Sequence, residues 1–122
     1  MKNLKKHFVA LSCSIVFSLG ASAEEVNVSG MPDKQLKGPE ISEVIKGKVV
    51  NGTTVNGDVR HDFRNDYVIY SNNKGFSDSG TWAIEGDQLC IKFRKWEDSC
   101  RFVFVEKGKL KLEGSGHAYI QR

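Results

Sequence analysis

The chain has 122 residues, with 18 lysine and arginine side chains against 15 aspartate and glutamate side chains. The positive excess lies at the N-terminus, because removing Lys2, Lys5 and Lys6 from the 18 basic residues leaves 15 basic against 15 acidic ones. An interspersed, neutral surface argues against nucleic-acid binding, which requires clustered positive charge. No apolar run after residue 23 approaches the roughly 20 residues that span a membrane. We therefore expect neither a nucleic-acid partner nor a transmembrane segment in the mature protein.

Residues 1–23 have the layout of a cleaved secretory signal peptide. Lysines precede an apolar stretch from Phe8 to Leu19, and the small residues Ala21-Ser22-Ala23 form the cleavage site. We therefore expect a mature protein of 99 of the 122 residues, located in the periplasm or secreted. Lipid modification of Cys13 is the alternative, but the residues before it make a poor lipobox, and cutting there leaves too short an apolar region for a signal.

A leader and a short helix are predicted before the main domain. Residues 24–37 hold few apolar side chains and are expected to form an irregular leader, whereas residues 38–122 are expected to form a single β domain. A helix is predicted over residues 38–47, because Pro39 suits the first helical position and Gly47 suits the end. Its apolar residues fall on one stripe with helical spacing: Ile41, Val44 and Ile45.

From Lys48 onward the apolar residues alternate with a period of two, which is typical of half-buried strands. In the segment Asp58–Arg64, for example, Val59, His61 and Phe63 share one face and the charged residues share the other. Eight strands are predicted: Lys48–Val50, Asp58–Arg64, Tyr67–Tyr70, Gly80–Ile84, Leu89–Arg94, Cys100–Val105, Lys109–Glu113 and His117–Ile120.

The predicted fold is all-β and mainly antiparallel. Every connection between the strands is short, whereas parallel neighbours need crossovers of about a dozen residues or more. A small up-and-down barrel of about eight strands satisfies this pattern, because its closure removes exposed sheet edges. The preceding helix would cover one end. A two-sheet sandwich is the alternative, but it requires longer Greek-key connections than the sequence contains.

Cys90 and Cys100 are predicted to form a disulfide, since thiols outside the cytoplasm are not kept reduced. Nine residues lie between them, and a ring of this size stabilises the fold by about 2.5 to 3 kcal/mol in the chain-entropy model. The alternation raises a conflict, because inward-pointing Phe93 and Phe102 place Cys90 outside the barrel and Cys100 inside it. We therefore expect a bulge or an offset near residues 96–98.

Catalytic and metal-binding patterns are weak in this sequence. The mature histidines, His61 and His117, lack metal-ligand spacings, so no metal and no cofactor is predicted. His61 lies on an apolar strand face and is interpreted as a hydrogen-bonded structural histidine. Ser115 and His117 are too far apart on a strand for a direct hydrogen bond, and Gly114-Ser115-Gly116 is interpreted as a turn. The chain is therefore not expected to be an enzyme.

Aromatic side chains are the remaining candidates for a binding site. Tyr67, Trp82 and Phe93 are predicted either to line a small apolar pocket in the barrel or to fill its core. The leading hypothesis is a non-enzymatic domain that binds a small apolar ligand or an extracytoplasmic protein at one barrel mouth. Acid–base catalysis is a further alternative if carboxylates of the Glu85–Asp87 and Glu97–Asp98 turns converge on a pocket.

Two regions carry a family resemblance. The run from Gly80-Thr81-Trp82 to Leu89-Cys90, followed by Cys100-Arg101, resembles small exported bacterial proteins of unknown function that have a lipocalin-like (calycin-like) flattened barrel. Residues 38–52 resemble the helix and first strand of the same group, so the resemblance covers about half of the mature chain. It implies a fold and an export route but no activity.

A shorter likeness lies near the C-terminus. The segment Ser115-Gly116-His117-Ala118-Tyr119 is similar to the Ser-Gly-x-x-Tyr loop by which periplasmic inhibitors of C-type lysozymes enter their target's cleft. This likeness implies that Ser115, His117 and Tyr119 contact a protein partner. Inhibition of a lysozyme-type cell-wall hydrolase is therefore the alternative function. The second motif of these inhibitors, with its lysine, has no counterpart before Arg122.

Overall fold

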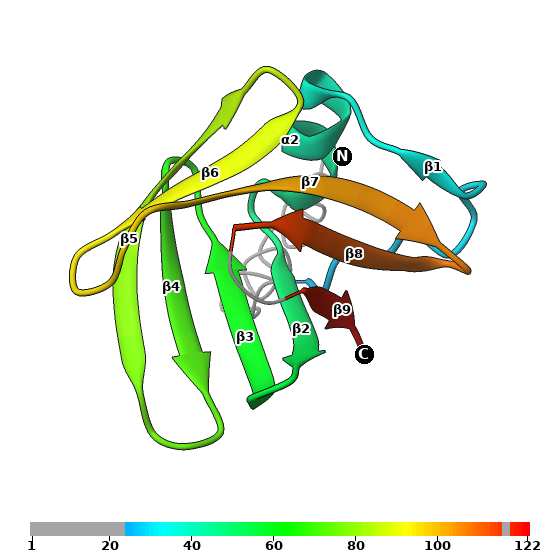
Figure 1. The fold of residues 1–122 in the computed structure, drawn as a ribbon. Helices are drawn as coiled ribbons and strands as arrows, with labels where there is room; N and C mark the ends of the chain where they lie inside the picture. The colour runs from blue at the N-terminus through cyan, green and yellow to red at the C-terminus, as the bar shows by residue number, and fades with distance from the viewer. Residues whose placement is uncertain (1–23, 116–117) are drawn as a thin grey trace, which may run out of the picture.

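Eight antiparallel strands close into a barrel, which confirms the predicted fold (Figure 1). The computed structural model describes residues 24–115 and 118–122, so the predicted signal peptide and His117 lie outside the described residues. A ninth strand, β1, pairs with one edge of β7. The elements are β1 (Lys34–Gln35), α2 (Gly38–Ile45), β2 (Val49–Thr54), β3 (Gly57–Phe63), β4 (Tyr67–Asn72), β5 (Ser77–Glu85), β6 (Gln88–Phe93), β7 (Ser99–Glu106), β8 (Lys109–Gly114) and β9 (Tyr119–Gln121).

The barrel is a meander in which each strand from β2 to β9 pairs with the next one along the chain. The short strand β9 then returns to β2, where Gly52 pairs with Gln121, and closes the sheet. Each strand from β2 to β9 is therefore paired on both sides over at least part of its length, as closure requires. The sandwich alternative is therefore wrong.

The strand β3 has the predicted faces, because Val59, His61 and Phe63 are all buried. The prediction for β7 is wrong, since Val103 is fully buried whereas Phe102 is 40% exposed. Both faces of this strand carry apolar side chains. The pattern of apolar and polar residues therefore does not show which face is the inner one. The valines of β7 therefore point into the barrel, and its phenylalanines point outward.

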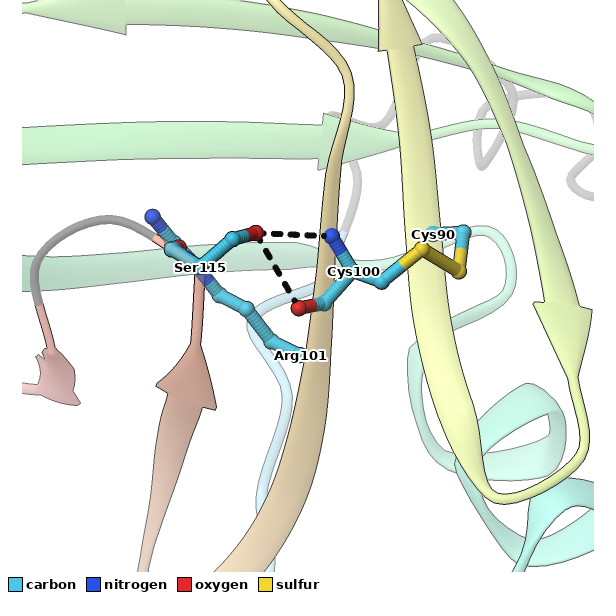
Figure 2. Close-up of a disulfide and its surroundings, with 4 residues drawn as sticks. All are labelled: Cys90, Cys100, Arg101 and Ser115. Atoms are coloured by element: carbon cyan, nitrogen blue, oxygen red, sulfur yellow. Dashed lines mark hydrogen bonds between the residues drawn. A yellow bond between two sulfur atoms is a disulfide. The ribbon is translucent and has the colours of Figure 1, made fainter.

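Reversing the faces of β7 also removes the conflict between the cysteines. Cys90 of β6 lies directly opposite Cys100 of β7, with their Cα atoms 4.0 Å apart. The two side chains form the predicted disulfide on the outer surface of the sheet (Figure 2). The disulfide is confirmed, and the expected bulge near residues 96–98 is wrong because both cysteines lie on the outer face.

The helix α2 covers one end of the barrel, as its single apolar stripe predicts. Ile41 and Ile45 are buried against the barrel interior. The first helical residue, Gly38, donates its backbone N–H to Asp87 Oδ1 at 2.8 Å in the turn between β5 and β6. A Cβ atom at this position would lie 2.4 Å from the carbonyl oxygen of Gly86. Only glycine therefore allows this approach between the helix and the turn.

The leader is more ordered than the sequence predicts. Its apolar residues Val26, Val28 and Leu36 are buried in the core. Its backbone is held to the barrel by hydrogen bonds from Val26 N to Val49 O at 2.9 Å and from Leu36 N to Val103 O at 2.8 Å. Only Val26 and Val28 alternate with polar neighbours, and this pattern is too short to predict a buried strand. The leader nevertheless extends the core.

Candidate functional site

An open cavity of about 530 Å³ occupies the end of the barrel opposite α2. The helix docks on the turn between β5 and β6. Because the strands are antiparallel, the β4–β5 and β6–β7 connections lie at the other end, where the cavity opens. The interior below the cavity, around Ile45, Val103 and Leu110, leaves no space for a water molecule. The barrel therefore has one packed end and one open end.

The floor of the cavity is formed by His61, Arg101 and Tyr119. His61 is only 4% exposed, and its ring centroid lies 5.1 Å from those of both Tyr70 and Tyr119. Burial, with a smaller contribution from the charge of Arg101, lowers the pKa of His61 to about 3. The imidazole is therefore neutral at physiological pH.

The burial of His61 agrees with its interpretation as a structural residue, but the expected hydrogen bond is missing. Among the described residues, no hydrogen bond joins the His61 side chain to another group. The ring is held instead by stacking on Phe63, with centroids 5.6 Å apart. His61 lines the cavity, and its ring nitrogens have no hydrogen-bond partner among the described residues.

Arg101 lies on the inner face of β7 and is partly buried. Its Nε atom donates a hydrogen bond to the backbone oxygen of Ser115 at 3.1 Å. Burial lowers the pKa of Arg101, although the nearby Tyr70 and Tyr119 act in the opposite direction. Arginine nevertheless remains protonated in proteins. The floor therefore carries one positive charge.

Tyr119 has a structural role in the floor. It is fully buried, and its hydroxyl donates to the backbone oxygen of Val50 at 2.9 Å. Burial raises the pKa of this phenol. Its ring crosses β2 at Gly52, where an added Cβ atom would lie 2.4 Å from the ring. The buried ring is thus unavailable to a protein partner in this conformation.

Tyr70, Phe93 and Trp96 form an aromatic wall above the floor. The centroid of the Trp96 ring lies 5.1 Å from that of Tyr70 and 5.8 Å from that of Phe93, in edge-to-face arrangements. Trp96 remains 41% exposed at the mouth, beside the more exposed Phe76. Edge-to-face packing of this kind fixes the ring positions. The wall therefore presents a defined apolar surface to the cavity.

The loop that carries Trp96 is fixed by a buried carboxylate. Asp78 accepts hydrogen bonds from the backbone N–H groups of Ser79 at 2.8 Å and Lys95 at 3.0 Å. Burial alone would raise the pKa of Asp78, but the backbone donors and the charge of Lys95 outweigh it and hold the pKa below its usual value. The ionised Asp78 therefore fixes the chain just before Trp96.

Of the three predicted ligand-binding residues, Phe93 alone lines the cavity. Tyr67 points outward and is 42% exposed, with the Arg64 guanidinium 5.9 Å from its ring centroid. Trp82 is buried at the helix-covered end, where its Nε1 atom donates to Arg64 O at 2.9 Å. Its ring packs against Phe63 as part of the core. The alternative interpretation of Trp82, as core filling, therefore fits its position.

Three cavity residues were not predicted from the sequence: Tyr70, Trp96 and Arg101. Tyr70 belongs to a run in which both faces are apolar, so its inward direction is not visible in the sequence. Trp96 lies in a polar connection that resembles an ordinary loop. The only signal for Arg101 is its position next to Cys100, because an outward cysteine implies an inward neighbour.

Ser115 lies at the edge of the cavity, where its hydroxyl bonds to the backbone of β7. Its Oγ atom accepts from Cys100 N at 3.0 Å and donates to Cys100 O at 3.2 Å (Figure 2). This pairing extends the contact between β7 and β8 by one residue. Gly114, predicted to begin a turn, is the last residue of β8, and Gly116 lies outside the described residues. His117 lies outside the described residues, so the partner-binding role predicted for it stays a prediction.

The turn carboxylates do not converge in the described structure. Asp87 accepts the hydrogen bond from Gly38 at the helix end, whereas Glu97 and Asp98 are exposed at the cavity mouth. The Glu85 carboxylate does lie within 4.8 Å of the sulfurs of both cysteines. Because these sulfurs are joined in a disulfide, they offer no thiolate ligand to a metal ion.

Comparison of the chain with protein-family models, curated protein sequences and solved structures finds no match. Among the described residues, no helix has the length and apolar character needed to cross a membrane. The cavity and its lining residues are therefore the observations that bear on function.

Proposed function

We propose that this protein is a non-enzymatic binding protein that holds a small, largely apolar ligand in the open end of its barrel. The observation that supports the proposal is the cavity of about 530 Å³ with its aromatic wall. Ligand sites typically have volumes of about 300 to 1,000 Å³ and combine apolar walls with a few polar groups. The composition of this cavity fits that pattern.

The contrast between the two ends of the barrel supports the same conclusion. The helix-covered end is filled by apolar side chains and leaves no space for water. A small domain gains stability from close packing, and voids in its interior cost stability. The open end departs from this rule although its aromatic residues are fixed by contacts and by Asp78. An ordered but unfilled space is what a ligand site requires.

The positions of the candidate catalytic residues support a non-enzymatic role. A serine nucleophile needs a neighbouring base to activate it, whereas the Ser115 hydroxyl is bonded to the Cys100 backbone. Glu97 and Asp98 are exposed, and an acid–base pair with separated pKa values needs an apolar setting for one carboxyl. The described residues therefore give no support to a catalytic alternative.

We propose that the protein acts outside the cytoplasm and is related to the lipocalin-like exported proteins that its sequence resembles. The disulfide is consistent with an oxidising compartment, and the eight-stranded barrel is consistent with the resemblance. The alternative function, inhibition of a lysozyme-type hydrolase, gains no support from the described residues. Ser115 and Tyr119 are both engaged in bonds within the barrel.

The proposal is tested by titrating the protein with Nile red, a neutral apolar dye. The chain has two tryptophans, so the Trp82→Phe variant leaves Trp96 as the single reporter at the cavity mouth. We expect saturable dye fluorescence and quenching of Trp96 in this variant. In the matched variant Trp96→Phe, quenching of Trp82 should be weaker, because Trp82 is buried in the core and does not line the cavity. Absence of saturable binding in both variants and in the unmodified protein would refute the proposal.

A further inference from the structure

The cavity floor holds a positive charge that is not paired with a carboxylate of any described residue. No carboxylate of a described residue lies within 4.0 Å of the Arg101 guanidinium. Glu97 and Asp98 line the same cavity, but they are exposed at its mouth. A partly buried charge without a partner is unfavourable, and proteins normally pair such groups. The unpaired Arg101 therefore points to a partner that is not part of the chain.

The groups around Arg101 strengthen this conclusion. His61 and Tyr70 line the cavity beside it, and among the described residues neither side chain has a hydrogen-bond partner. His61 is 4% exposed, so water at the surface satisfies little of its ring. Because His61 is neutral, it adds no second charge. The cavity thus has one cation at its floor, beside two residues whose side chains have no hydrogen-bond partner among the described residues.

From this arrangement we infer that the ligand carries a single carboxylate, which the Arg101 guanidinium binds at the floor, and a flat apolar body, which lies against the aromatic wall. The inference rests on the proposed function, because it names the ligand class of the same cavity. A guanidinium suits a carboxylate because it donates two parallel hydrogen bonds. Flat rings suit Tyr70, Phe93 and Trp96 because aromatic faces and edges pack in defined geometries. Glu97 and Asp98 at the mouth would repel a second anionic group.

The test compares two probes of nearly the same shape by isothermal titration calorimetry at about pH 7. Cinnamate carries a charged carboxylate, and cinnamamide carries a neutral amide in its place. Charge-assisted hydrogen bonds are roughly twice as strong as neutral ones, so we expect the unmodified protein to bind cinnamate at least about tenfold more tightly. The Arg101→Met variant should lose this preference, and Arg101→Lys should retain part of it. Arg60→Met is the matched control, because Arg60 is exposed on β3 and does not line the cavity.

Nile red serves as the neutral reference for all three variants. Cooperative thermal unfolding of Arg101→Met, together with saturable Nile red binding of any affinity, shows that the barrel is folded and its cavity still accepts a neutral molecule. Equal binding of cinnamate and cinnamamide by a protein that binds Nile red would overturn the inference and leave the proposed function standing. A preference for cinnamate that survives in Arg101→Met, or disappears in Arg60→Met, would also overturn it. Failure of all three probes to bind the unmodified protein would overturn both proposals.

Discussion

Replacing His61 by phenylalanine should remove much of the acid sensitivity of the folded state. At about pH 7 the imidazole is neutral in the folded and the unfolded chain. Below its ordinary pKa of 6.5, the unfolded chain binds a proton that the folded chain does not bind until the pH approaches about 3. Between about pH 7 and pH 4, this difference lowers the free energy of unfolding by roughly 3 kcal/mol. The His61→Phe variant lacks this contribution.

Urea unfolding followed by circular dichroism measures the effect at several pH values. Carboxylates also titrate in this range, but they are common to both proteins and cancel in the difference between their free energies of unfolding. We expect the unmodified protein to lose about 3 kcal/mol relative to the variant on acidification. A difference that stays constant with pH would show that the folded chain protonates His61 at the same pKa as the unfolded chain. The conclusion that burial keeps His61 neutral down to about pH 3 would then be incorrect.

Three further changes probe the floor, the loop and the disulfide. Gly52→Ala places a methyl group against the ring of Tyr119, and it should lower the free energy of unfolding, measured by thermal unfolding, by about 1 to 3 kcal/mol. Gly30→Ala is the control, because nothing lies within 4 Å of the added atom, and it should leave the free energy of unfolding nearly unchanged. Asp78→Ala removes the acceptor that fixes the loop, so the fluorescence of Trp96 in a Trp82→Phe background should shift to longer wavelength; an unchanged spectrum would contradict this role. Replacing both bridge cysteines by serine should cost about 2.5 to 3 kcal/mol in urea unfolding, and no loss would show that the bond does not form.

The fold was predictable where one face of an element is polar. In β3, charged residues alternate with Val59, His61 and Phe63, so a single inner face is visible in the sequence. The helix was predictable for the same reason. In β7 the two faces are equally apolar, and only the tertiary structure decides that Val103 is buried and Phe102 is not. Side-chain size is thus a poor guide to burial in a strand that is apolar on both faces.

The site was less predictable than the fold, because its residues depend on which face of β7 points into the barrel. Arg101 enters the cavity only if Cys100 faces outward, and a prediction that places Phe102 inside places Arg101 outside. Trp96 comes from a connection whose path is set by a distant carboxylate, Asp78. No local pattern links residues that are this far apart. Phe93 was predicted because its own strand, β6, alternates in agreement with the structure.

The bond between Cys90 and Cys100 has a consequence beyond stability. The covalent ring that it closes contains Phe93 and residues 96–99, which are cavity residues. A restrained loop loses less conformational entropy when a ligand binds, so it binds the ligand more tightly than a flexible loop with the same side chains. In the proposed exported protein this restraint arises only after translocation. Disulfide formation would then raise the ligand affinity as well as the stability of the protein, and the reduced precursor would bind its ligand weakly.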